Sequence, residues 1–309
     1  MFDLAGKRIW VAGHTGMVGS ALVRRLGREG CEMITATRRE LDLTRQVEVE
    51  QFVGDQRPDA IVLAAARVGG ILANDTHPAD FLYDNLLIET NVIGAAHASD
   101  VGRLLFLGSS CIYPRLAPQP IDEEALLTGP LEPTNEWYAI AKIAGMKLAE
   151  ALRKQRGRDY ISAMPTNLYG PGDNFDLASG HVLPALIRKA HEAKLSGAAS
   201  IAIWGTGTPR REFLHVDDCA DALVFLLKTY SDALHVNVGS GEDLSILELA
   251  HLVCEVVGFE GTIVHDISKP DGTPRKLMSA DRLRAMGWAP SIRLKQGIAH
   301  TYRWFLGQR

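Results

Sequence analysis

The stretch "RIWVAGHTGMVGSALVRRL", residues 8–26, decides the fold. Its apolar start is typical of a buried strand, and Gly13, Gly16 and Gly19 then follow in GxxGxxG spacing. Glycine permits a tight turn from strand into helix and lets the backbone approach a pyrophosphate, while the free N–H groups of the helix N-terminus favour an anion. Because this loop joins a strand to a helical segment, we predict that it binds a dinucleotide.

The remaining chain repeats this alternation of apolar runs and helix-length segments. Further strand-like runs are "EMITAT", "DAIVLAA", "RLLFLGSS" and "YISAMPTNLYG". Strands separated by helices require crossover connections, which give a parallel sheet covered by helices on both faces. We therefore predict an α/β fold with a doubly wound parallel sheet of the Rossmann type.

Glycine and proline cluster in "YGPGDNF", where the pattern changes. Beyond it, "REFLHVDDCADALVFLLK" indicates a return to the sheet, in which we expect His215 to order the strand and Asp217 and Asp218 to accept from the N–H groups of the next helix. We predict a dinucleotide-binding domain and a smaller, partly interleaved C-terminal substrate domain. The first comprises 1–174 plus about 211–238, and the second about 175–210 plus 239–309.

Composition narrows the function classes. The chain has 309 residues, of which 46% are apolar and 23% charged, with a formal charge of -4. It has no broad basic field, so we expect neither nucleic acid nor a membrane surface as a partner. The four cysteines are scattered without a CxxC pair, so we expect no metal site and no disulfide framework. Without a basic leader or an apolar window of membrane-spanning length, we expect the cytoplasm.

The end of the second predicted strand bears on the choice of cofactor. NAD-selective sites usually carry a carboxylate there, which accepts from the ribose 2′-hydroxyl. Here "ITATRREL" offers Arg38 and Arg39, and a guanidinium suits the 2′-phosphate of NADP. Glu40 leaves NAD open, and two solvated arginines at a helix start are the alternative interpretation.

Tyr138 and Lys142 in "NEWYAIAKIAG" are four residues apart and so share one helical face. An ammonium group beside a phenol favours the phenolate, which makes tyrosine useful as an acid or base. Ser109 follows a predicted strand in "FLGSSCIYP", where sheets of this kind place their ligands. The three residues together predict reduction of a ketone by hydride transfer. The alternative is an ordinary amphipathic helix with a solvated lysine.

These motifs resemble the extended short-chain dehydrogenase/reductases, and within them the GDP-L-fucose synthase family. The closer resemblance is carried by "AGHTGMVGSA", "LAAARVGGILAN", "PADFLYDN", "LGSSCIYP", "LEPTNEWYAIAKIAG", "MPTNLYGPGDNF", "WGTGTPRREFLHVDD" and "SKPDGTPRK", and it extends nearly from end to end. It implies an NADPH-dependent, bifunctional enzyme. Such an enzyme epimerises GDP-4-keto-6-deoxy-D-mannose at C3 and C5 and then reduces C4, and it forms a homodimer.

The resemblance also implies roles for single residues. Tyr138 would be the acid of the reduction, assisted by Ser109 and Lys142; Cys111 would be the base of the epimerisation and His181 the acid. Residues implied to contact the cofactor are Gly13, His14, Thr15, Gly16, Met17, Val18, Gly19, Arg38, Leu107, Gly108, Ser109, Ser110, Lys142, Pro165, Thr166, Asn167, Leu168 and His181. Those implied to contact the GDP-sugar are Lys189, Trp204, Arg211 and Ser279.

Three positions depart from the family's pattern. Thr15 stands where some members carry an arginine for the cofactor phosphate, and Lys189 replaces an arginine and so loses its planar fork. Ser279 stands where an acidic ligand is expected, and Asp281 is the nearby carboxylate.

Other functions remain open from the residues alone. Cys111 is either an inert buried thiol or a thiolate base, and the loop "SSCIYP" lacks the carboxylates that favour dehydration. A 4-epimerase with tightly held NAD, a reductase of a 3-deoxy analogue and a non-catalytic cofactor-sensing protein are the alternatives.

Overall fold

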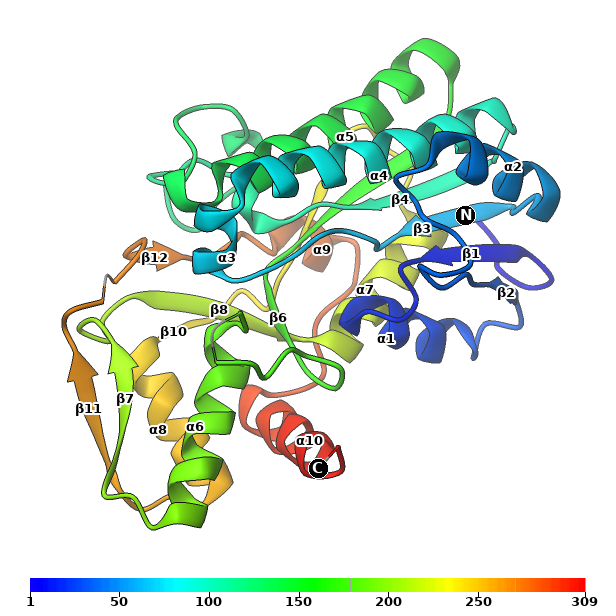
Figure 1. Cartoon of the computed structure of the whole chain (residues 1–309). Coiled ribbons are helices and arrows are strands. Elements are labelled where there is room, and N and C mark those ends of the chain that lie inside the picture. The colour runs from blue at the N-terminus through cyan, green and yellow to red at the C-terminus, as the bar shows by residue number, and fades with distance from the viewer. Residues whose placement is uncertain (178, 270, 309) are drawn as a thin grey trace.

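The computed structural model describes residues 1–177, 179–269 and 271–308, so Pro270 of the "SKPDGTPRK" motif lies outside the described residues. Its larger part is a parallel six-stranded sheet in the order β2-β1-β3-β4-β5-β9 (Figure 1). The strands are β1 (Arg8–Ala12), β2 (Glu32–Ile34), β3 (Ala60–Leu63), β4 (Arg103–Leu107), β5 (Asp159–Pro165) and β9 (Val236–Val238). The winding direction reverses between β1 and β3, which confirms the predicted doubly wound fold.

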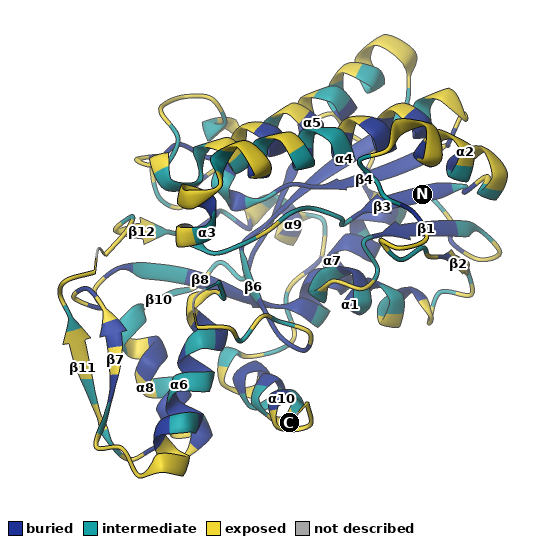
Figure 2. Cartoon of the chain, viewed as in Figure 1, coloured by how far each residue is buried: buried dark blue, intermediate teal, exposed yellow. Residues whose placement is uncertain are grey.

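Helices cover both faces of this sheet. One face carries α1 (Met17–Leu26) and α7 (Val216–Thr229), and the other carries α2 (Gln46–Gln56), α4 (Pro78–Ala98) and α5 (Glu136–Arg156). Neighbouring β1 residues point to opposite faces, so Val11 packs under α1 and α7 whereas Trp10 packs under α2 and α4. Figure 2 shows the central strands buried and the helices exposed on their outer sides, which explains the uninterrupted apolar runs.

The loops that leave the strands contain short helical pieces. These are α3 (Ile71–Thr76), α9 (Asp281–Ala285) and three 3₁₀ turns: η1 (Ser110–Ile112), η2 (Glu123–Ala125) and η3 (Pro133–Asn135). η1 follows β4 directly and contacts α5, while η3 runs into the start of α5. The cysteine loop and the Tyr138 helix are therefore neighbours.

The smaller part has its own core, centred on Ile187, Leu249 and Ile298, all fully buried. One of its sheets contains β6 (Asn167–Tyr169), β8 (Arg210–His215), β10 (Asp243–Ser245) and β12 (Arg275–Lys276), and the other pairs β7 (Ser200–Trp204) with β11 (Thr262–Asp266). Its helices are α6 (Val182–Ser196), α8 (Ile246–Val257) and α10 (Leu294–Leu306). Over the described residues, no helix is both long and apolar enough to cross a bilayer.

The chain passes between the two parts more than once. α7 and β9 pack with the six-stranded sheet, whereas β8 lies in the smaller sheet. Leu283 and Trp288, which the sequence analysis assigns to the second domain, are buried in the core beneath α1 and α7. The domain boundaries themselves stay a prediction.

Candidate active site

Two of the three glycines in the loop after β1 are required by packing. A Cβ on Gly13, which has φ +89°, would lie 2.7 Å from the Cα of Ala65, and one on Gly19 would lie 2.0 Å from the carbonyl oxygen of Gly13. At Gly16 the nearest atom would be 3.5 Å away, an ordinary contact. Gly16 therefore leaves open space at the start of α1, which suits the close approach of a phosphate.

The N-terminus of α1 is prepared for an anion. Gly16 caps the helix without a side-chain hydrogen bond, and the first turn contains no acidic residue. Beside it, the Nδ1 atom of His14 is buried and finds no hydrogen-bond partner in the described part of the chain. Thr15 is exposed at the tip of the loop. These residues fit the pyrophosphate of a dinucleotide.

Arg38 and Glu40 lie just beyond β2, where the adenosine ribose of a dinucleotide is expected. The Glu40 carboxylate accepts from the backbone N–H and the hydroxyl of Thr37, at 2.8 and 2.9 Å. These bonds hold the pKa of Glu40 below its usual value and occupy the carboxylate. The Arg38 side chain is exposed. The geometry at this strand end therefore favours a 2′-phosphate contact by Arg38.

The predicted cofactor residues after β4 and β5 lie at the carboxyl ends of these strands. A Cβ on Gly108 would lie 2.1 Å from the sulfur of Met164, so the strand ends pack closely. The Thr166 N–H donates to the carbonyl of Val238 at 3.0 Å, and the Asn167 amide donates to β8. Leu107, Ser110, Pro165 and Leu168 occupy the same edge of the sheet. This is the edge at which doubly wound sheets bind their ligands.

The structure brings Tyr138, Lys142 and Ser109 together. The Lys142 ammonium is buried, donates to the carbonyl of Leu107 at 2.9 Å and lies 5.9 Å from the centroid of the Tyr138 ring. The Tyr138 hydroxyl bonds to Ser109, and the ring of Phe81 contacts the tyrosine edge to face at 6.4 Å. These residues come from β4, α4 and α5, so the sheet edge and the helix pair position the group.

The surroundings of Tyr138 keep its proton in place. Burial is the largest cause that raises the pKa of the phenol, and the charges of Cys111 and Glu89 raise it further. The Ser109 hydrogen bond acts in the opposite direction. At neutral pH the phenol is therefore protonated, as a general acid must be before it acts.

Cys111 is not surrounded by apolar groups alone. Its backbone N–H donates to the Ser109 hydroxyl at 3.3 Å, which fixes the turn η1. Its sulfur accepts from the Asn135 amide at 3.3 Å and lies 3.8 Å from the Lys276 ammonium. Donors and a cation stabilise a thiolate. The sequence analysis missed Asn135 and Lys276 because both come from segments distant from the cysteine.

His181 is exposed and directly precedes α6. The loop before it is joined to the loop after β3, since the Gly70 N–H donates to the carbonyl of Ser179 at 3.2 Å. Within the described residues, no hydrogen bond connects His181 with Cys111 or Tyr138. Its catalytic role stays a prediction.

Three of the predicted substrate residues lie in the smaller part of the structure. Lys189 on α6 donates to the carbonyl of Ala202 at 2.9 Å. Trp204 ends β7 with 47% of its surface exposed, and the Lys269 ammonium lies over its ring, 5.6 Å from the centroid. Arg211 donates to the carbonyl of Thr273 at 2.6 Å, and burial lowers the pKa of its guanidinium. Their roles in binding stay predictions.

Within the described part of the chain, the hydrogen bonds of Ser279, the fourth predicted substrate residue, involve none of the other three. Its N–H donates to Ile121, and its hydroxyl accepts from the N–H of Asp281 at 3.3 Å. The carboxylate beside the Trp204 turn is Asp271, which accepts from the N–H and the hydroxyl of Thr206 at 2.7 and 3.0 Å. The sequence analysis did not single out Asp271, although it quoted the motif "SKPDGTPRK" that contains it.

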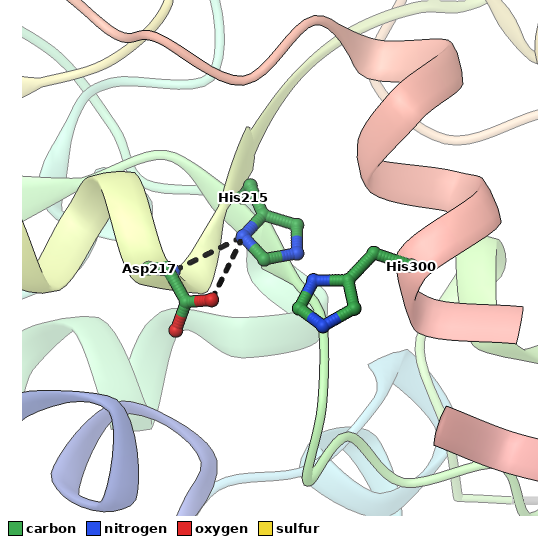
Figure 3. Close-up of side chains that lie close together, drawn as sticks. All are labelled: His215, Asp217 and His300. Atoms are coloured by element: carbon green, nitrogen blue, oxygen red, sulfur yellow. Dashed lines mark hydrogen bonds and ion pairs between the residues drawn. The ribbon is translucent and has the colours of Figure 1, made fainter. Parts of the chain in front are cut away.

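The "FLHVDD" segment differs from its prediction. His215 itself caps α7, because its Nδ1 accepts from the Asp217 N–H at 3.2 Å (Figure 3). Asp217 pairs with Arg24 at 2.6 Å instead, and Asp218 binds the segment before α10. The ring of His300 on α10 stacks on His215, with centroids 5.3 Å apart and 19° between the planes. His215, Asp217 and His300 therefore connect β8, α7 and α10.

Comparison with known proteins agrees with this arrangement. The model of the NAD dependent epimerase/dehydratase family matches residues 9–239, from β1 to just past β9. The chain belongs to this family.

Relatives within the epimerase/dehydratase family cover the whole chain. It is 65% identical to a GDP-L-fucose synthase from Sinorhizobium fredii, over 99% of this chain and 98% of that protein. It is 37% identical to a GDP-L-colitose synthase from Yersinia pseudotuberculosis, over 98% and 99% of the two chains.

Solved structures of family members are also similar. A GDP-6-OMe-4-keto-L-xylo-heptose reductase from C. jejuni has a TM-score of 0.93 at 36% identity and covers 100% of this chain and 99% of its own. A GDP-L-fucose synthetase from Naegleria fowleri bound to NADP has a TM-score of 0.89 at 27% identity, with coverage of 98% and 95%.

Proposed function

We propose that the chain is a GDP-L-fucose synthase, which converts GDP-4-keto-6-deoxy-D-mannose into GDP-L-fucose with NADPH. The 65% identity with a named synthase supports this function. The observation that carries it is the Cys111 sulfur, held by Asn135 and Lys276 in the turn that begins at Ser109. The site thus combines a thiolate base with the groups for ketone reduction.

Epimerisation begins with proton removal. The C4 ketone acidifies the C–H bonds at C3 and C5, and the Cys111 thiolate removes these protons. The hydroxyl groups of Tyr138 and Ser109 donate hydrogen bonds to the C4 oxygen, where negative charge develops. His181, as the acid, returns a proton to the opposite face, which inverts each centre.

Reduction follows at C4. Bound NADPH supplies the hydride, and Tyr138 donates its phenolic proton to the C4 oxygen. The Lys142 ammonium stabilises the resulting phenolate and would hold the nicotinamide ribose of the cofactor. Gly16, His14 and the first turn of α1 would hold the pyrophosphate of the cofactor.

Sequence identity, and not the predicted GDP-binding residues, favours one of the alternative products. Trp204, Arg211 and Lys189 would bind the GDP portion, which both fucose and 3-deoxy products share. The chain is 65% identical to the GDP-L-fucose synthase but 37% identical to the GDP-L-colitose synthase, which favours the fucose product. A 4-epimerase has no need of the thiolate base.

We also place the enzyme in the cytoplasm as a homodimer. All four cysteines are free thiols, which a reducing compartment permits. The outer sides of α4 and α5 carry exposed apolar side chains that a second copy would cover.

The test incubates wild type and Cys111→Ser with GDP-4-keto-6-deoxy-D-mannose and NADPH in deuterium oxide and locates the label by NMR. Wild type should incorporate deuterium at C3 and C5 and oxidise NADPH, whereas Cys111→Ser should lose most of the labelling and keep the binding of NADPH. Equal labelling in both proteins would remove Cys111 as the base. Labelled substrate without NADPH oxidation would indicate an epimerase alone.

A further inference from the structure

A buried carboxylate that the mechanism above does not use lies behind the reductive group. Glu89 on α4 is fully buried, and its Oε1 is 2.9 Å from the Nζ of Lys142. A Cβ on Gly145, three residues after Lys142 on α5, would lie 2.5 Å from the Glu89 Oε2. Glycine at this position therefore makes room for the carboxylate between the two helices.

Burying two charged groups costs free energy of desolvation, so the presence of this ion pair calls for an explanation. Burial is the main cause that raises the pKa of Glu89, and Lys142 opposes this effect. Lys142 is itself only 2% exposed, and it also contacts the neutral Leu107 carbonyl and the rings of Phe106 and Tyr138. Removing one partner of such a pair leaves an uncompensated charge in the interior. Each group is thus the ion-pair partner that compensates the buried charge of the other.

The charged groups around this pair are few in the described part of the site. Glu89 on α4 faces Lys142, and Tyr138 lies beside Lys142 on the same helix, α5. The charge of Cys111 in η1 raises the pKa of the Tyr138 phenol. β4 contributes Phe106 and Leu107, which carry no charge. Within the described residues, Glu89 is therefore the carboxylate that pairs with the lysine.

We propose that Glu89 is a positioning residue for the reduction step: its buried ion pair holds the Lys142 ammonium in place beside the Tyr138 ring. This inference rests on the proposed function. Within the described residues Glu89 pairs with Lys142, and no contact joins it to the Cys111 sulfur, so we expect it to affect the hydride half of the reaction more than the proton exchange at C3 and C5. Through its ion pair with Lys142 on α5, the Glu89 carboxylate also connects α4 with the active site.

The test uses Glu89→Gln, with Glu89→Asp as the conservative variant. The matched control is Glu123→Gln, another buried carboxylate, which accepts from the Asn237 N–H at 3.0 Å and lies near Arg282 instead of Lys142. Thermal unfolding first confirms that each variant is folded. NADPH affinity by fluorescence, the pH profile of kcat/KM for reduction and deuterium exchange at C3 and C5 are then measured.

In Glu89→Gln, the alkaline limb of the reduction profile should move to lower pH by about one unit, because the lost charge is one of those that raise the pKa of the Tyr138 phenol. NADPH should bind about tenfold more weakly, because Lys142 has lost the partner that holds it in place. A factor of ten corresponds to part of the free energy lost when a buried ion pair is broken. Exchange at C3 and C5 should change less than reduction, because the Cys111 thiolate that removes these protons has no contact with Glu89 in the described part of the site. Glu89→Asp should recover part of the shift, and Glu123→Gln should show none.

Profiles and NADPH affinities that coincide for wild type and Glu89→Gln would overturn the inference. An equal shift in Glu123→Gln would overturn it too, because general loosening would then explain the change. If wild type leaves NADPH unoxidised with this substrate, the proposed function fails, whereas the NADPH affinities of the two variants still decide the role of Glu89.

Discussion

At the level of one side chain, we predict that Arg38 selects between the two nicotinamide cofactors. Its exposed guanidinium follows β2, and the neighbouring Glu40 is bound to Thr37 and so does not compete for the ribose. Arg38→Ala should weaken NADPH binding by roughly tenfold to hundredfold, as expected when a charge-assisted hydrogen bond to phosphate is lost. NADH binding should change less than about twofold, because NADH lacks the 2′-phosphate. Fluorescence titration with each cofactor measures both effects.

Arg39→Ala is the control for this prediction, since Arg39 is also exposed and has the same charge. It should leave the ratio of the two affinities close to that of wild type. Parallel losses of NADPH and NADH in Arg38→Ala would contradict a 2′-phosphate contact, and Thr15 on the glycine loop would then be the next residue to test.

Single residues also show which parts of the candidate site could be predicted from the sequence. Tyr138, Lys142 and Ser109 were identified by spacing and by position at a strand end, and the structure places them together. Asn135 and Lys276 were missed, because no local pattern connects a residue before a helix or one on a distant edge strand with the Cys111 sulfur. Contacts between distant segments are determined by the fold, and one sequence contains no direct signal for them.

The helix pair α4 and α5 is the element for which we predict a partner. Tyr83 on α4 is 65% exposed and Ile140 on α5 is 37% exposed, although both are large and apolar. Gly94, also on α4, has open space above it, which permits close helix packing. A second copy of the chain packed on this face would bury these side chains.

Wild type should therefore elute as a dimer in size-exclusion chromatography with light scattering, and the double variant Tyr83→Glu, Ile140→Glu should elute as a monomer, because two charges on each copy cannot be buried without partners. Leu195→Glu is the control, since Leu195 is 70% exposed on α6, in the smaller part. A monomeric wild type, or dissociation in the control, would refute a dimer through α4 and α5.

Strands were harder to predict where one apolar run of the sequence forms strands of two different sheets. "YISAMPTNLYG" has the pattern of a single strand, yet β5 lies in the large sheet and β6 pairs with β8 in the small one. The change occurs at Thr166, whose N–H still bonds to β9. Alternation of strands and helices predicted the larger sheet well, because each crossover needs a helix. The small sheets have two- to six-residue strands, which give too little periodicity for prediction.

Stability of the whole molecule should depend on pH through two buried histidines. Burial lowers the pKa of His215 and of His235 to about 4. An unfolded histidine titrates near 6.5, so between pH 6.5 and 4 the unfolded chain binds more protons than the folded one. The stabilising contribution of each is thus complete above about pH 6.5 and is lost as the pH falls toward 4, with about 2 kcal/mol lost per histidine between pH 7 and 5.

Asp173 acts in the opposite direction, so the total change is not the decisive measurement. Burial raises the pKa of its carboxyl to about 7, and the folded protein therefore binds the extra proton below that pH and gains stability as the pH falls. We expect the difference between variants to separate the contributions: in urea unfolding at pH 7 and 5, His235→Gln should lose about 2 kcal/mol less than wild type on acidification. The exposed His251, changed to Gln, should behave as wild type. If His235→Gln and wild type lose equal stability, His235 gains its proton in the folded protein as readily as in the unfolded chain, and its contact with the Tyr113 hydroxyl at 2.9 Å must then hold a charged ring in the core at pH 5.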